Sequence, residues 1–401
     1  MEGPWRVQTV RKLGGITFLK CFPWVFLGSS STVEESYEFL LQRTDKGYLE
    51  NIKKLHPGAI VYGKVGEKDS KGRRSLEITR IQNPSRFPST FPKNPITDKE
   101  IRYNEPILDI FSNRRRLKLL VDRSRIQRKV SQILHKKGFL RVTTPVLETQ
   151  PGGGDSEPFE TFSNYNGKKY YLRSCHEFPG KKLLIKGLDK VYIQGPIFRN
   201  EDLGKVHIFE FEGLQGYYLI QKEEGFNSLV RLVQEIYTAC YKEIHGNTKL
   251  GEQNLEAPWP VVEWKDLTSD LSPESLRTIQ AKLKKNPQEF KLPPAYHLSK
   301  PPSESCPLAA NEGRVALSFQ TLIKGVEITT CYVQQNDSKA LTVKGGSDKG
   351  WINCDFLKSL DYGLPPAAGF GIGIDRLAYT ILREGNALVS NIRDIQAFPT
   401  L

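Results

Sequence analysis

The feature that most constrains the fold of this chain is a glycine-rich stretch close to its carboxyl end. From Gly369 to Gly373, glycine alternates with a large apolar residue. This alternation predicts a buried strand with one bare face, against which another group can approach the backbone closely. Asp375 and Arg376 then open an apolar helix, which places a guanidinium beside a helix N-terminus, where a polyphosphate is favoured. The alternative is a glycine-rich strand-to-helix turn with a surface arginine.

A second stretch favours the ligand-binding interpretation. Residues 197–217 predict two strands joined by a charged loop, and this segment carries Arg199, Glu201, His207 and Phe211 in that order. Together with the glycine-rich stretch, it resembles motifs 2 and 3 of the class II aminoacyl-tRNA synthetases. The spacing is most similar to that of the lysyl enzymes of this family.

The resemblance implies activation of an amino acid, in which a carboxylate attacks the α-phosphate of ATP and the site must neutralise and align two anions. It implies that Arg199 bridges carboxylate and α-phosphate with a bidentate geometry that lysine does not copy. His207 would then bind the β- and γ-phosphates and Arg376 the γ-phosphate. Glu201 would accept a hydrogen bond from the adenine amino group, and Phe211 would stack under the ring. ATP and Mg²⁺ are the implied cofactors, with Arg199 and Arg376 as the catalytic residues.

The same resemblance implies an amino-acid pocket and a metal-binding position. The pocket residues by this comparison are Gly153, Glu177, Gln215, Tyr217, Thr330, Tyr332 and Gln334. Glu177 would bind the α-ammonium of the substrate through a charge-assisted hydrogen bond, and the alternative is a carboxylate that caps its own helix. Glu327 would bind magnesium, and Gln320 occupies a second position associated with that metal.

Several pocket positions depart from the family pattern. Lysyl enzymes present two glutamates to the ε-ammonium of lysine, and the matching residues here are Gln215 and Gln334. Gln320 also replaces a family carboxylate, Thr330 replaces an asparagine, and Val206 replaces an arginine of the motif 2 loop. Loss of two charges opposite a buried ammonium weakens discrimination by several kcal/mol. The identity of the activated amino acid is therefore open at this point.

The first part of the chain predicts a separate nucleic-acid-binding domain. Residues 1–95 alternate short strands with turns around one helix from Tyr48 to Leu55 and end in a proline-rich linker, 84–95. Five strands and a helix fit a small OB barrel, which binds single-stranded nucleic acid through aromatic stacking and a basic groove. The segment resembles the anticodon-binding domain of the lysyl, aspartyl and asparaginyl enzymes. Phe18 is the stacking candidate, and barrel core is its alternative role.

The formal net charge of +13 predicts a polyanionic partner, because neutralised phosphates release counterions when a basic protein binds. Basic residues crowd into the segments 64–80 and 114–137. The six cysteines are scattered singly, which argues against a zinc ribbon or a disulfide framework. We find no apolar run long enough to span a bilayer and no secretory signal, so we expect a cytoplasmic protein.

Two further segments complete the comparison with the family. A basic amphipathic helix over 112–137, followed by an extended segment at 139–147, resembles motif 1, which forms the dimer interface in the family. A plain core helix with an edge strand is the alternative. Residues 391–399 resemble the terminal strand of the catalytic domain.

These observations predict an α+β chain. Residues 96–401 would form a class II synthetase catalytic domain, an antiparallel sheet flanked by helices, behind an N-terminal OB-fold barrel in residues 1–95. The predicted function is that of a lysine–tRNA ligase-like homodimer, which forms an aminoacyl adenylate with ATP and Mg²⁺ and transfers the amino acid to tRNA. Two alternatives stay open. One is a paralogue that activates another amino acid for a non-tRNA acceptor, and the other is a non-catalytic regulator that binds tRNA or ligand.

Overall fold

The computed structural model describes residues 4–14, 16–23, 37–42, 45, 47–70, 72–83, 94–153, 156–221, 225–270, 272–285, 287–345 and 354–399. The chain forms two compact units, Met1–Val121 with Ala397–Pro399, and Asp122–Gln396. The predicted linker at 84–95 lies outside the described residues except for its last two positions. The domain boundary near residue 95 therefore stays a prediction.

The first unit contains a closed five-stranded barrel in the order β1-β2-β3-β5-β4, as expected for an OB fold. Its elements are β1 (Trp5–Leu13), β2 (Ile16–Pro23), β3 (Tyr37–Gln42), α1 (Tyr48–Lys54), β4 (Ile60–Lys68) and β5 (Arg74–Gln82). Trp5 and Phe39 fill the barrel core with their rings edge to face, 5.1 Å apart. Phe18 lies outside that core, and the guanidinium of Arg73 covers its ring at 5.5 Å. Of its two possible roles, the core role is excluded.

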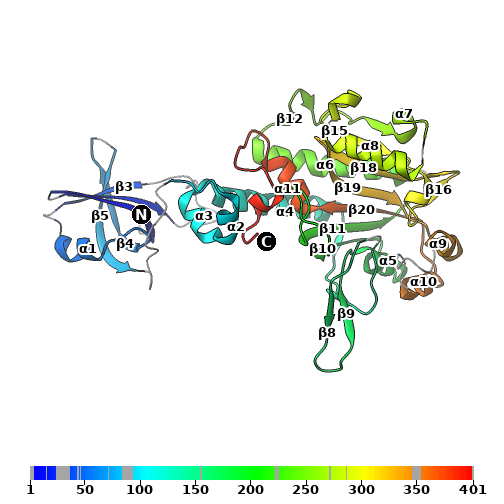
Figure 1. Ribbon diagram of the computed structural model, residues 1–401, viewed down its shortest axis with the longest axis horizontal. Coiled ribbons are helices and arrows are strands. Elements are labelled where there is room, and N and C mark those ends of the chain that lie inside the picture. Colours follow the sequence, from blue (N-terminus) through cyan, green and yellow to red (C-terminus); the bar gives the residue numbers. More distant parts are fainter. Residues whose placement is uncertain are drawn as a thin grey trace. The chain divides into compact units, whose positions relative to one another are not determined.

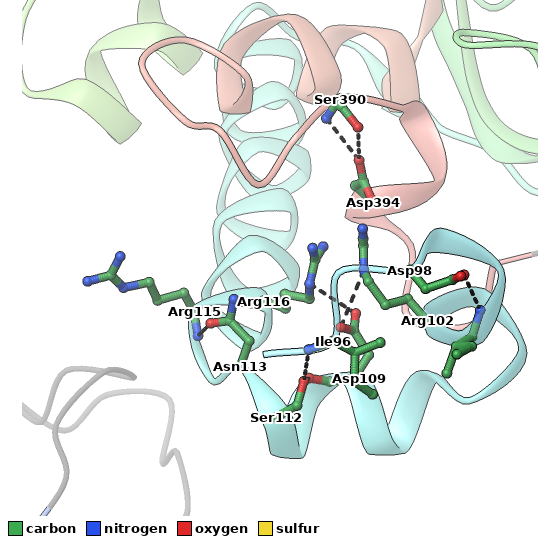
Figure 2. Close-up of polar contacts among 11 residues, drawn as sticks. Ile96, Asp98, Arg102, Asp109, Ser112, Asn113, Arg115, Arg116, Ser390 and Asp394 are labelled. Carbon is green, nitrogen blue, oxygen red and sulfur yellow. Dashed lines mark hydrogen bonds and ion pairs between the residues drawn. The ribbon is translucent and has the colours of Figure 1, made fainter. Parts of the chain in front are cut away.

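Two short helices, α2 (Lys99–Asn104) and α3 (Pro106–Ser112), complete the first unit. Figure 2 shows the side chains of Arg102 and Arg116 pointing at Asp109, with Nε to carboxylate oxygen distances of 3.4 and 3.0 Å. All three side chains are almost completely buried. Since a buried charge is tolerated only when it is paired, this cluster accounts for Arg116, one of the arginines at the start of the basic run at 114–137.

The second unit is built on one large sheet. Its helices and strands are α4 (Arg115–Lys136, which begins before the unit), β6 (Leu140–Arg141), β7 (Leu147–Glu148), β8 (Glu160–Phe162), β9 (Lys169–Leu172), α5 (Glu177–Ile185), β10 (Lys190–Phe198), β11 (Glu210–Leu219), α6 (Gly225–His245), β12 (Lys249–Leu250), β13 (Gln253–Asn254), β14 (Val261–Glu263), α7 (Trp264–Leu267), α8 (Pro273–Lys285), β15 (Ala295–Ser299), β16 (Asn311–Glu312), β17 (Val315–Ala316), β18 (Ser318–Ile323), β19 (Val326–Val333), α9 (Ser338–Gly345), α10 (Cys354–Leu360), β20 (Ala367–Gly373) and α11 (Ile374–Leu382). Short 3₁₀ helices lie at Pro287–Phe290, Ser303–Ser305 and Ile392–Ile395.

The sheet has eight strands in the order β14-β15-β18-β19-β20-β11-β10-β6. Neighbours are antiparallel except at the two edges, where β14 pairs with β15 and β6 with β10 in parallel. Figure 1 shows the central strands with α6 and α11 packed beside them, and the β8–β9 hairpin projecting away from the sheet. The predicted α+β fold, an antiparallel sheet flanked by helices, is confirmed.

The two faces of the sheet differ because side chains alternate along each strand. On one face, Phe370 packs edge to face against Phe139, with ring centroids 5.8 Å apart. On the same face, the Tyr218 and Ser228 hydroxyls are hydrogen bonded at 2.7 Å, which joins the sheet to α6. The glycines of β20 lie on the opposite face, which we call the front. The apolar side chains of β20 thus hold the strand in the core, while its glycines present no side chain on the front.

The predicted terminal strand at 391–399 is wrong. The chain forms a 3₁₀ helix at Ile392–Ile395 instead, because its first turn is closed by a capping box. The Asn391 side chain accepts a hydrogen bond from the backbone N–H of Arg393 at 2.9 Å, and Asp394 accepts one from the backbone N–H of Asn391 at 2.9 Å. Local side-chain acceptors of this kind compete with strand pairing for the backbone donors.

Four cations of the basic run at 114–137 form ion pairs inside the second unit. Its members there include Arg123 with Asp375, Arg125 and Lys129 with Glu243, and Lys137 with Glu235, at 2.7 to 3.3 Å. These cations therefore add less to a nucleic-acid-binding surface than their number in the sequence implies. None of the described helices has both the length and the apolar character needed to cross a membrane.

Candidate active site

A cavity lies on the front of the sheet, where β10, β11, β19 and β20 meet the start of α11. Eight of the sequence-predicted site residues line it: Arg199, Glu201, His207, Phe211, Gln215, Glu327, Thr330 and Arg376. They come from three separate regions of the sequence. The fold therefore brings the residues predicted for nucleotide and for catalysis to one place.

Two guanidiniums reach this cavity from different elements. Arg199 follows β10, and its guanidinium lies over the Phe211 ring at 5.5 Å. The buried Nε of Arg199 has no hydrogen-bond partner among the described residues. Arg376 lies in the first turn of α11 and donates to the backbone oxygens of Val206 and Glu327, at 3.2 and 3.4 Å. An unsatisfied buried donor is costly, so the Arg199 guanidinium is suited to an anionic ligand.

Asp375 fixes the position of Arg376. Its side chain is buried, with 1% of the residue exposed, and it accepts hydrogen bonds from Arg123 Nη2 and from the backbone N–H of Glu212, both at 2.7 Å. The second of these ties the first turn of α11 to β11. The guanidinium of Arg376 is thereby held at the cavity by its neighbour in the sequence.

His207 adds a neutral donor to the same cavity. Partial desolvation, together with the positive charges of Arg376 and Lys284, lowers the pKa of its imidazole. The ring is therefore uncharged at neutral pH, and one of its nitrogens can donate a hydrogen bond to a phosphate oxygen. Lys284, which belongs to α8, was not identified from the sequence because no motif surrounds it.

The two residues predicted to hold magnesium lie on neighbouring strands, Gln320 on β18 opposite Thr330 and Glu327 on β19. Glu327 lines the cavity and its carboxylate accepts a hydrogen bond from the Thr330 hydroxyl at 2.7 Å. Gln320 is not among the residues that line the cavity, and its side-chain oxygen accepts from Gln280 Nε2 at 3.4 Å. Within the described residues, no cluster of three or more His, Cys, Asp or Glu side chains could hold a metal by itself. One carboxylate beside a triphosphate nevertheless fits Mg²⁺, which takes its other ligands from phosphate and water.

Glycines of β20 form the floor of the cavity. Gly371 pairs with Gln215 on one side and with Thr330 on the other, so it lies between two predicted pocket residues. A Cβ atom on Gly371 would lie 3.4 Å from the nearest atom, in Gln215, which is ordinary contact. A Cβ atom on Gly369 would lie 2.5 Å from Gln334 and 2.7 Å from the Tyr217 ring. The two glycines thus differ in what a methyl group would meet.

We expect this pair to separate ligand binding from folding. G371A places a methyl group on the cavity floor without a clash, so the KM for ATP should rise while stability stays within about 1 kcal/mol of the wild type. G369A should lower the free energy of unfolding by about 2 kcal/mol through overpacking. Urea denaturation and steady-state kinetics of both variants check these outcomes. A normal KM in G371A would contradict the idea that a ligand lies against this floor.

The remaining predicted pocket residues form a buried group next to the cavity. Tyr217 and Tyr332 flank Gly369 on the two neighbouring strands, and the Tyr332 hydroxyl donates to Glu177 Oε1. Burial, followed by the negative charge of Glu177, raises the pKa of both tyrosines. They therefore remain protonated donors. Gln334 donates from Nε2 to the Tyr332 backbone oxygen at 3.1 Å.

Gln334 has an open acceptor. Its Oε1 is buried and has no hydrogen-bond partner within the described part of the chain. Since a buried polar atom without a partner is costly, this oxygen is suited to a donor from a ligand. Gly153 is not among the residues that line the cavity; its φ is +123°, and a Cβ atom there would lie 2.5 Å from Ser174 and 2.9 Å from Cys175. A side chain there would be strained and would strike both neighbours.

Sequence analysis missed two residues that position the predicted ones. The backbone N–H of His176 donates to Gln215 Oε1, and the buried His176 ring contacts the carbonyl oxygens of Gly195 and Gly213, each at 3.3 Å. Burial lowers the pKa of this imidazole to about 4, so the ring is neutral, and the contact that holds Gln215 comes from the backbone N–H. The second missed residue is Lys181, whose ammonium is completely buried beside Glu177.

Comparison with known proteins agrees with this geometry. The family described as tRNA synthetases class II (D, K and N) matches residues 98–401. The lysine–tRNA ligase of Fervidobacterium nodosum is 29% identical, over 91% of this chain and 76% of the relative. That of Thermosipho melanesiensis is 27% identical, over 98% of this chain and 84% of the relative. That of Pelotomaculum thermopropionicum is 29% identical, over 99% of this chain and 85% of the relative.

Proposed function

The chain belongs to the class II tRNA synthetases of the D, K and N group, and on this basis we propose that it is a lysine–tRNA ligase-like enzyme. It activates its amino acid with ATP and transfers it to a tRNA. Residues 96–401 form the catalytic domain, and residues 1–95 form the anticodon-binding domain. The names of the similar proteins and the lining of the cavity both support this assignment.

Arg199 carries the chemistry of the first step in this proposal. The carboxylate of the amino acid attacks the α-phosphate of ATP and pyrophosphate leaves, so the barrier comes from bringing two anions together. The Arg199 guanidinium binds both anions and neutralises the charge that builds up between them. Its buried Nε without a partner is the observation that best supports this role.

The other cavity residues bind and align ATP. Phe211 stacks under the adenine ring and Glu201 accepts from its amino group, while His207 and Arg376 bind the terminal phosphates. Glu327, together with the triphosphate, would hold Mg²⁺, which would supply shielding of the phosphate charge and stabilise the pyrophosphate leaving group. The chain itself supplies positioning and electrostatic stabilisation, and the reaction needs no side-chain nucleophile.

The buried group beside the cavity binds the amino acid. Glu177 pairs with the α-ammonium, while Gln215, Tyr217 and Gln334 surround the end of the side chain, with Gly153, Thr330 and Tyr332 around them. The open Oε1 of Gln334 accepts from the ε-ammonium of lysine. Two amides in place of two carboxylates leave this ammonium with weaker partners, so we expect a high KM for lysine.

A tRNA and a second copy of the chain are the partners in this proposal, and the cytoplasm is its location. The first 95 residues contain a closed barrel. On this barrel an arginine guanidinium lies over an aromatic ring, as for Arg80 over Tyr62 at 5.3 Å. Basic and aromatic side chains placed together in this way suit single-stranded RNA. Leu140 and Leu147, in the segment after α4, are 52% and 51% exposed, and Phe162 on the projecting hairpin is 67% exposed. Apolar side chains that remain this exposed support an interface with another copy.

ATP–pyrophosphate exchange, measured with each proteinogenic amino acid in turn, tests the proposed function. We expect exchange with lysine that depends on Mg²⁺ and saturates at high lysine concentration. Exchange with a neutral amino acid alone would overturn the assignment to lysine. Absence of exchange with every amino acid, for a protein that still binds tRNA, would overturn the assignment as an enzyme.

A further inference from the structure

Lys181 is the most deeply buried charged side chain near the proposed pocket, and none of the proposed steps uses it. Its side chain has 0% exposure, and its Nζ lies 2.5 Å from Glu177 Oε1. Glu177 itself is 8% exposed at the side chain. The two residues lie one turn apart on α5, on the side of the helix that faces the core. A completely buried ammonium needs a strong reason to be kept, because burial of a charge is costly.

The side chains around the Lys181 ammonium favour a cation. Its Nζ lies 5.6 Å from the centre of the Tyr332 ring and 5.4 Å from that of Phe356. Aromatic faces attract a cation at these distances. The Phe356 ring is also fixed, since it stacks on Phe178 with centroids 4.8 Å apart. The ammonium is therefore held in one place by a carboxylate and two rings.

Lys181 and Tyr332 both act on the same oxygen of Glu177. Lys181 Nζ pairs with Oε1, and the Tyr332 hydroxyl donates to Oε1 as well. Within the described residues, no hydrogen bond or ion pair uses the second oxygen, Oε2. A ligand cannot contact the fully buried ammonium of Lys181, whereas the Glu177 side chain keeps 8% exposure. Lys181 can therefore affect a ligand only through Glu177.

From this geometry we propose that Lys181 is a positioning residue for amino-acid binding: it anchors Oε1 of Glu177, so that Oε2 is presented to the α-ammonium of the substrate. The proposal rests on the proposed function of the pocket and adds a residue that selects ammonium-bearing substrates. A carboxylate held on one side by an ammonium and a hydroxyl keeps its orientation. Less conformational entropy is then lost when the substrate binds to it.

Kinetics of four proteins test this role: the wild type, K181M, E177Q and the double variant E177Q/K181M. We expect K181M to raise the KM for the amino acid about tenfold, as for loss of one charge-assisted hydrogen bond, with kcat and the KM for ATP almost unchanged. E177Q should raise the same KM. Because Lys181 acts only through Glu177, adding K181M to E177Q should change the KM by less than about twofold. K182M, which removes the same charge from the next position of α5, is the matched control and should behave as the wild type.

An unchanged or lower KM for the amino acid in K181M would overturn the proposal. A KM in E177Q/K181M that rises by the product of the two single-variant effects would overturn it as well. If K181M alone does not fold, the comparison of E177Q with E177Q/K181M still decides, because a buried Lys181 facing an amide can give up its proton and the double variant removes both partners, so neither protein keeps a buried unpaired charge; a further rise in KM there would contradict the proposal. If the wild type catalyses exchange and K181M has the same KM for the amino acid as the wild type, only this inference is overturned. Lack of exchange by the wild type would overturn the proposed function, and this inference with it.

Discussion

The R199K variant should lose amino-acid activation almost completely, with exchange reduced about a thousandfold. Lysine keeps the positive charge but has a single ammonium, which cannot bind a carboxylate and a phosphate side by side as the guanidinium fork does. The buried Nε of Arg199, which has no partner among the described residues, is one of the donors that would be lost. Since the interaction forms fully only in the transition state, most of the effect should fall on kcat.

R277K is a suitable control, because Arg277 is exposed on α8 and the substitution makes the same chemical change. Exchange by R277K should equal that of the wild type. Circular dichroism of R199K should be unchanged, since the side chain supports ligand and not the fold. Exchange by R199K within about tenfold of the wild type would contradict the role that we assign to Arg199.

Replacement of Asp375 by alanine should destabilise the second unit by about 3 kcal/mol. The Asp375 carboxylate accepts from Nε and Nη2 of Arg123 and from the backbone N–H of Glu212, and its loss leaves three donors unpaired, one of them in the backbone of the sheet. The first turn of α11 then loses its link to β11. Because this turn carries Arg376, exchange should fall even in conditions where D375A is fully folded.

Guanidinium denaturation, followed by near-UV circular dichroism, measures the stability change. D375N is the variant to compare with D375A, because an amide oxygen can still accept a hydrogen bond from the Glu212 N–H. It should lose roughly two thirds as much stability as D375A, since one of three hydrogen bonds is retained. A D375A variant with an unfolding free energy within about 0.5 kcal/mol of the wild type would contradict the structural role of this carboxylate.

The nucleotide side of the site was predictable because its signals are local. Arg199, His207 and Phe211 lie within one short strand-loop-strand segment, and strand alternation sends Phe211 and Gln215 to the same face. The glycines at 369, 371 and 373 predict the bare face of β20 for the same reason. Pairing of β11 with β20 then brings the two segments together, with Gln215 opposite Gly371.

The amino-acid side was less accessible to sequence analysis because it depends on contacts between distant segments. Lys181 in sequence is an ordinary lysine on an amphipathic helix, where a solvent-exposed position is the usual expectation. Only the packing of α5 against β19 and α10 shows that its ammonium is enclosed by Tyr332 and Phe356. Likewise, the 3₁₀ turn after Asn391 depends on reciprocal side-chain bonds that a strand-like pattern conceals.

The central claim is that Arg199 and Arg376 bind one triphosphate, and a crystal structure with a non-hydrolysable ATP analogue tests it most directly. We expect a nucleotide in the front cavity, with its α-phosphate at the Arg199 guanidinium and its γ-phosphate at that of Arg376. A nucleotide bound elsewhere, or one that touches only one of the two arginines, would contradict it.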